Sequence, residues 1–172
     1  MRTEDEAEYA ELVAAVSTRL FHTAYAVCRD RAVAEDAVQS ALTTAYMSWR
    51  RVRAADSPEA YLRRMVLNQL FTWRRRRSWR AEEPRAEVPD TGGASHEDSV
   101  ATHDEVWRAL AALPARQRAV VVLRYYEDLS EAQIADALAI RPGTVKSQTS
   151  AAMARLRREL HDDVYARRED RT

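Results

Sequence analysis

Short polar side chains near the C-terminus are the clearest sign of a binding function in this sequence. The stretch from Leu129 to Leu160 has the pattern of a helix, a tight turn and a second helix. In the second helix Val145, Thr149 and Ala152 recur at three- and four-residue steps, so they should face inward. The positions between them carry no acid, which is typical of the helix that a helix-turn-helix places in the DNA major groove. They include Thr144, Lys146, Ser147, Gln148 and Ala151.

A run of arginines in the middle of the chain indicates a second surface for a polyanion. Between residues 50 and 80 there are ten arginines against two acids, and Arg74, Arg75, Arg76 and Arg77 are consecutive. Phosphate-neutralising cations beside aromatic rings that stack on bases suit single-stranded or melted nucleic acid. The alternative is that the aromatic residues lie in the core, which we expect for Trp73, and that the arginines only keep the helix soluble. Four adjacent like charges weaken this alternative, because they repel one another unless an anion is bound.

A polar stripe follows one face of the segment 32–52. Glu35, Asp36, Gln39, Ser40 and Thr43 recur at helical spacing, opposite an apolar face. Patterning alone favours a solvated face over a docking surface for a partner helix.

The composition predicts no catalytic, metal or cofactor site and no small-molecule substrate. There is no glycine-rich phosphate loop and no recognisable nucleophile–base pair. The single cysteine, Cys28, cannot form an internal disulfide, and we expect it in the core. His96 and His103 are seven residues apart, which is weak evidence for a metal site. Without a signal peptide or membrane span, we expect a cytoplasmic protein that is not an enzyme.

The elements that must position these residues form an all-α chain of two small helical domains. Only three glycines occur in 172 residues, and strand-type alternation is rare. We predict a first domain over residues 5–80 with helices near 5–28, 32–52 and 59–80. An acidic segment, 81–103, contains two prolines and two glycines and should be a flexible linker. The second domain should span 104–162, followed by a charged, frayed tail over 163–172.

Local signals mark where several helices begin. Ser57 can cap a helix that has Pro58 at its first position. Ser130 is followed three residues later by Gln133, which is the spacing of a capping box. Pro142 suits the first turn of the second helix of the helix-turn-helix, because its missing N–H needs no partner there.

Two stretches of the chain resemble one protein family. The sequence AEDAVQSALTTAYMSWRRV, followed by PEAYLRRMVLNQLFTWRRRR, resembles region two of the sigma factors of bacterial RNA polymerase. LPARQRAVVVLRYYEDLSEAQIADALAIRPGTVKSQTSAAMARLRREL resembles their region four. Having only these two regions, the chain is similar to the extracytoplasmic-function group (group 4), and GTVKSQTS is similar to the sigma-E subgroup common in actinobacteria.

The resemblance implies a role for each group of residues. It assigns polymerase binding, to the clamp helices of the largest subunit, to Asp36, Gln39, Ser40 and Thr43. It assigns the proximal promoter element to Arg53, Asp56, Ser57, Arg63, Arg64 and Asn68, with the basic run Arg74, Arg75, Arg76 and Arg77. It assigns the upstream promoter element to Arg141, Thr144, Lys146, Ser147, Gln148 and Ser150. Ser40 and Gln148 differ from the Glu and Arg that relatives often carry, and Gln favours adenine where Arg favours guanine.

The resemblance therefore implies a promoter-specificity subunit that helps to melt DNA and performs no chemistry itself. Its expected partners are core RNA polymerase, through the clamp helices and the flap, promoter DNA and an anti-sigma factor. One alternative is a dimeric helix-turn-helix regulator that does not join the polymerase. A third class is an RNA-binding interaction protein, which would leave the capped helix-turn-helix unexplained.

Overall fold

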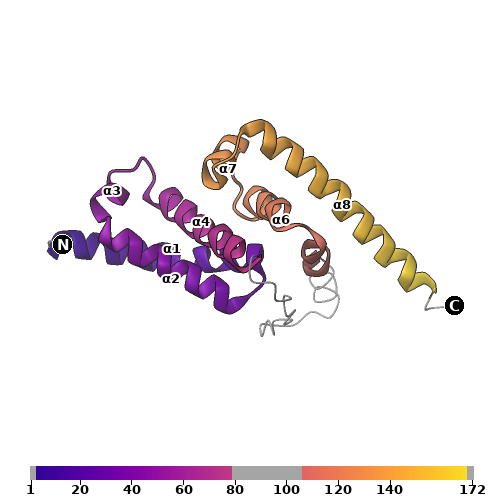
Figure 1. Cartoon of the computed structure of the whole chain (residues 1–172), viewed down its shortest axis with the longest axis horizontal. Helices are drawn as coiled ribbons and strands as arrows, with labels where there is room; N and C mark the ends of the chain where they lie inside the picture. The colour runs from indigo at the N-terminus through magenta and orange to yellow at the C-terminus, as the bar shows by residue number, and fades with distance from the viewer. Residues whose placement is uncertain (1–2, 79–105, 170–172) are drawn as a thin grey trace.

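The structure is a computed structural model, and every regular element in the residues that it describes is a helix (Figure 1). It describes residues 3–78 and 106–169, with backbone alone for 73–78 and 161–169. The N-terminal module comprises α1 (Thr3–Cys28), α2 (Arg31–Met47), α3 (Trp49–Arg53) and α4 (Pro58–Ser78). The C-terminal module comprises a helical segment over 106–112, α6 (Ala115–Val121), the π-helical turn η1 (Val122–Tyr126), α7 (Glu131–Leu138) and α8 (Pro142–Glu169). The predicted all-α class is confirmed, while the predicted linker, 81–103, lies outside the described residues.

Side-chain caps fix where three of these helices begin. The hydroxyl of Ser57 accepts a hydrogen bond from the first turn of α4, as predicted. At α7 the capping box is complete: Ser130 N–H donates to the Gln133 side chain at 2.8 Å, and Gln133 N–H donates to Ser130 Oγ at 3.3 Å. Asp30, which lies between the predicted helices 5–28 and 32–52, caps α2 by accepting from Val33 N–H at 3.0 Å.

The predicted helix over 32–52 is two helices, and this boundary was missed. The backbone leaves helical geometry at Ser48, with φ −115° and ψ 28°, and the Ser48 hydroxyl donates to the Thr44 carbonyl at 2.7 Å. Trp49 and Val52 nevertheless remain buried. The apolar pattern crosses the break without a gap, so periodicity could not reveal it.

The last helix, α8, is longer than predicted. It continues to Glu169, whereas we expected a frayed tail from residue 163. No glycine or proline follows Gly143, so the sequence contains no residue that would stop the helix. Residues 170–172 of the predicted tail lie outside the described residues.

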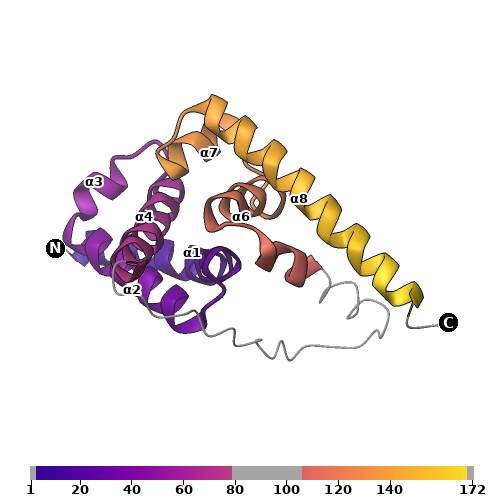
Figure 2. The same cartoon turned by 45° about the vertical axis from the view of Figure 1, so that its right-hand side comes forward.

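The two modules pack against each other, which the sequence did not predict. Helix α7 packs on α4, and α6 and η1 pack on α1 (Figure 2). Leu62 and Val66 of α4 belong to the same cluster of buried apolar side chains as Leu123, Ile134 and Val145. We call this packing of the two modules the docked arrangement.

Candidate nucleic-acid interface

The first turns of α8 separate into a buried face and an exposed face, as predicted. Val145 and Ala152 are fully buried in the C-terminal module. Thr144 and Gln148 are half-buried. The exposed side chains of the predicted upstream reader are Arg141, Lys146, Ser147 and Ser150. This face of α8 is therefore open to a duplex in the docked arrangement.

Few internal contacts restrain this exposed face. The Lys146 ammonium lies 3.8 Å from a carboxylate oxygen of Glu131, and its side chain is 70% exposed. The Ser147 hydroxyl donates to the Thr144 carbonyl at 3.0 Å, which leaves its oxygen able to accept. A Cβ on Gly143 would meet no atom within 4 Å, so the surface beside the helix start is open.

The loop before α4 exposes its predicted residues at the surface, whereas Arg53, at the end of α3, already has anionic partners. Asp56 and Ser57 are exposed. The Arg53 guanidinium lies 2.8 Å from a carboxylate oxygen of Asp5 and 3.1 Å from one of Glu8, with 48% of its side chain exposed. These pairs tie the end of α3 to the start of α1.

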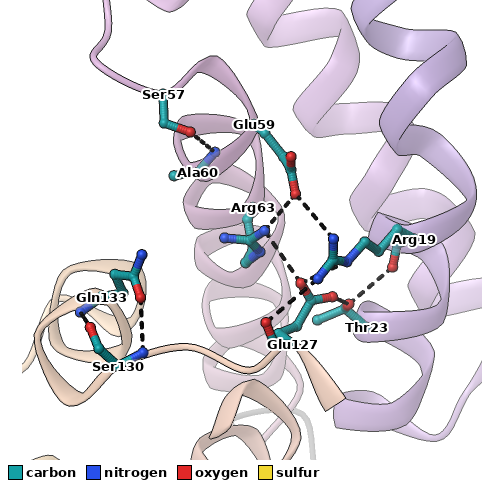
Figure 3. Close-up of polar contacts among 9 residues, drawn as sticks. All are labelled: Arg19, Thr23, Ser57, Glu59, Ala60, Arg63, Glu127, Ser130 and Gln133. Atoms are coloured by element: carbon teal, nitrogen blue, oxygen red, sulfur yellow. Dashed lines mark hydrogen bonds and ion pairs between the residues drawn. The ribbon is translucent and has the colours of Figure 1, made fainter. Parts of the chain in front are cut away.

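Arg63 does not lie on the surface that its predicted role requires. It is buried, and its guanidinium lies 2.7 Å from Glu59 and 3.3 Å from Glu127 of the C-terminal module (Figure 3). Arg64 is half-exposed and pairs with Asp136 of α7 at 3.0 Å. A promoter contact by Arg63 is therefore excluded in the docked arrangement. Asn68 is exposed. Arg74, Arg75, Arg76 and Arg77 have side chains that lie outside the described residues.

The polar stripe of α2 is exposed and borders an apolar groove. Its members Asp36, Gln39, Ser40 and Thr43 are all exposed. Gln39 and Thr43 also line a groove of about 630 Å³ between α1 and α2. The apolar lining of the groove consists of Tyr9, Val13, Phe21, Val38, Leu42 and Tyr46. A polar stripe beside an apolar groove can accept a partner helix, because such a helix needs both kinds of contact.

Glu127 and Tyr46 are two candidate functional residues that the sequence analysis missed. The side chain of Glu127 is 1% exposed and contacts α1 and α4. No local pattern distinguishes it from the exposed acid Asp128 beside it. Tyr46 stays 44% exposed while packing edge-on against Tyr9. Tyr46 follows Thr43 by three residues, so its helical spacing places it next to the polar stripe, and this spacing is the signal that could have identified it in the sequence.

Other features of the described residues do not suggest a different kind of site. In residues 3–78 and 106–169, no helix has the length and apolar character needed to cross a membrane. The same ranges contain no cluster of three or more His, Cys, Asp or Glu side chains arranged for a metal ion. Burial raises the pKa of the Cys28 thiol to about 11, and its Sγ donates to the Asp30 carbonyl at 3.2 Å. Cys28 is thus a packed, weakly reactive thiol.

Two family models match the chain in the order that the resemblance implied. Sigma-70 region 2 matches residues 12–80, and sigma-70 region 4 matches residues 103–156. Together they account for most of the chain. The α2 stripe, the loop and α4 fall in the first match, and the capped helix-turn-helix falls in the second as far as Leu156.

Individual relatives and solved structures agree with these matches. The RNA polymerase sigma-E factor of Streptomyces antibioticus is 36% identical over 168 residues, covering 93% of this chain and 89% of the relative. The extracytoplasmic-function sigma factor SigM of Mycobacterium tuberculosis is 35% identical over 127 residues, covering 74% and 64%. The fold is shared with the sigma factor RpoE of Bartonella quintana, solved with the anti-sigma factor NepR, at a TM-score of 0.73 and 23% identity over 90% of this chain and 97% of that one. The chain therefore belongs to the sigma-70 family, as an extracytoplasmic-function sigma factor of the sigma-E type.

Proposed function

We propose that this chain acts in the cytoplasm as a promoter-specificity subunit that joins core RNA polymerase and directs it to two promoter elements. The observation that carries the proposal is the exposed polar stripe of α2 beside its apolar groove, in a chain that also exposes a recognition helix. A helix-turn-helix regulator would need the recognition helix but would need neither the α2 stripe nor the groove. The polymerase clamp helices would dock on Asp36, Gln39, Ser40 and Thr43, and α8 would read the upstream element as duplex.

The two DNA-reading surfaces would each bind weakly and act together once the polymerase holds them. Binding of the first element raises the effective concentration of the second, so overall affinity grows without any new contact. We therefore expect the free chain to bind promoter duplex poorly and the assembled holoenzyme to bind it specifically. A tight footprint by the free chain, unchanged by core polymerase, would contradict this proposal.

Substitution of the stripe tests the polymerase contact directly. The variant Asp36→Ala/Gln39→Ala should fold normally, because both side chains are exposed on α2. It should lose assembly with core polymerase in gel filtration and lose run-off transcription on a promoter library. A matched control is Glu11→Ala, which removes one exposed acid two residues from both Tyr9 and Val13, on the opposite side of α1 from the groove.

The dimeric-regulator alternative makes the opposite prediction for these variants. It requires that Asp36→Ala/Gln39→Ala retain transcriptional control and that the DNA site be palindromic. No observation in the structure favours it, since the α2 stripe would then have no partner.

We also propose an anti-sigma factor as a further partner. Two proteins of the same fold were solved in complexes: RpoE with the anti-sigma factor NepR, and CnrH with the cytosolic domain of CnrY. These neighbours are 23% and 20% identical to this chain, so they support the class of partner and not a particular contact.

A further inference from the structure

The start of α1 contacts both ends of the short helix α3. Helix α3 has only five residues, and a helix this short is not stable by itself. Its first residue, Trp49, packs edge-on against the ring of Tyr9 of α1, with 5.5 Å between the ring centroids. Its last residue, Arg53, pairs with Asp5 at 2.8 Å and with Glu8 at 3.1 Å. These contacts with the first turns of α1 therefore help to fix where α3 ends.

The two acids surround the guanidinium of Arg53 in a way that leaves it a poor ligand for a phosphate. Both carboxylates contact the same nitrogen, Nη1 of Arg53. Asp5 is 6% exposed, and a buried carboxylate is costly unless a cation stays beside it. Two carboxylates outnumber the one cation here, so a phosphate that approached Arg53 would meet a net repulsion. The geometry suits an internal anchor better than a DNA contact.

The loop 54–57 of the proximal reader begins directly at this anchor. At its other end the Ser57 hydroxyl accepts a hydrogen bond from Ala60 N–H at 3.2 Å, in the first turn of α4. Asp56 and Ser57 are exposed between the two fixed ends. A loop that is already ordered before binding loses less conformational entropy when it binds. Anchoring Arg53 should therefore strengthen and sharpen recognition by the loop, although the acids do not touch DNA themselves.

We infer that Asp5 and Glu8 are positioning residues of the proximal promoter reader, which hold the loop 54–57 through Arg53 in the shape that receives the displaced promoter strand. The inference rests on the proposed function and changes the expected role of Arg53 from a DNA contact to an anchor. Both acids precede the sigma-70 region 2 match, which begins at residue 12.

An anchoring Arg53 and a DNA-binding Arg53 predict opposite effects of removing the acids. If Arg53 bound a phosphate, loss of the two carboxylates would free its charge and tighten DNA binding. If Arg53 anchors the loop, the same loss releases the loop and weakens binding. Arg53→Ala separates the two roles again, because a lost phosphate contact lowers the salt slope on a single strand by about 0.7, whereas a lost anchor leaves that slope unchanged.

The test uses holoenzyme assembled from core polymerase and the full chain. Its ligand is a fluorescent promoter fragment, selected by the wild type from a library, whose proximal element is single-stranded. In anisotropy, Asp5→Asn/Glu8→Gln should weaken binding about fivefold, within the roughly tenfold that one correct base pair contributes. Arg53→Ala should weaken binding by a similar factor. All three changes together should be no worse than either, because they break one shared contact.

Sequence discrimination separates positioning from general loss of stability. On a fragment with one changed base in the proximal element, the acid variant should bind nearly as well as the wild type does. Its discrimination at the upstream element should stay unchanged, because α8 lies in the other module. Equal weakening on both proximal sequences, or tighter binding by the acid variant, would overturn the positioning role.

Glu6→Gln is the matched control. It removes an exposed acid from the same first turn of α1, so the change in charge near the helix dipole is the same. The control should leave affinity and discrimination unchanged. A result for Asp5→Asn/Glu8→Gln that only equals the control would also refute the inference.

Two further measurements keep the test decisive. Circular dichroism and assembly with core polymerase check the fold of each variant. If the double variant does not fold, Glu8→Gln decides alone: its side chain is 49% exposed, and it should weaken binding about threefold, with no weakening as the refuting result. The wild-type holoenzyme is scored first. Its failure to form or to select a proximal sequence would sink the proposed function, whereas a selective wild type with unresponsive variants would sink the positioning role alone.

Discussion

Truncating Ile134 should unfold the helix-turn-helix more readily than any surface change in α7. Ile134 is fully buried, in the same cluster as Leu129 and Val145. Ile134→Ala deletes three buried carbons at about 0.8 kcal/mol each, or roughly 2.4 kcal/mol before any cavity cost. Because the helices on either side are held by other contacts, the cavity should not collapse fully. The total loss should therefore fall within about 2–5 kcal/mol.

Urea unfolding followed by circular dichroism measures this loss. With a slope of about 2 kcal/mol per molar, the midpoint of Ile134→Ala should fall by at least about 1 M. Ile134→Val removes one carbon and should lower the free energy of unfolding by about 1 kcal/mol, so the loss should grow with the number of carbons removed. The control is Ala132→Gln, on the exposed side of the same helix, with an effect within about 0.5 kcal/mol. If Ile134→Ala lowers the free energy of unfolding by less than 1 kcal/mol, Ile134 does not anchor α7 in the core.

Two further predictions concern single backbone and side-chain sites. Ala139, at the end of α7, has left-handed backbone angles, φ 51° and ψ 47°, which cost an alanine about 1 kcal/mol. Ala139→Gly should leave the urea midpoint unchanged or raise it, whereas Ala139→Val should lower it; a marked loss with glycine would contradict this. Burial raises the pKa of the Cys28 thiol from 9.0 to about 11, so the thiolate is scarce at pH 8. Iodoacetamide labelling of the native chain should stay slow at pH 8 and accelerate toward pH 11, and fast labelling at pH 8 would be the opposing result.

Features that depend on a few neighbouring residues were predictable from the sequence. The capping box of Ser130 and Gln133 and the helix start at Pro142 both occur as expected. Each depends on backbone groups within four residues, so the relevant partners are already adjacent in the sequence. The inward positions Val145 and Ala152 followed from helical periodicity for the same reason. The division of α8 into a buried and an exposed face was therefore accessible without a structure.

Contacts between distant segments could not be derived in this way. The break at Ser48 leaves the apolar pattern intact, since Ala45 before it and Trp49 after it both pack inward. Glu127 and Arg63 meet only because η1 packs on α1 and α7 packs on α4, and each residue lies in a stretch with several other charges. Periodicity reports which side of a helix is apolar, and it does not report which helix will cover that side.

Arg63 shows that the sequence can indicate which class of ligand a side chain binds without indicating the ligand itself. From its position in a basic helix we expected an anion, and the structure places an anion against its guanidinium, but one from the chain itself. A planar guanidinium fits the paired oxygens of a carboxylate and of a phosphate almost equally well. The residue type therefore identifies the class of ligand, while the packing of the modules decides which member of that class is bound.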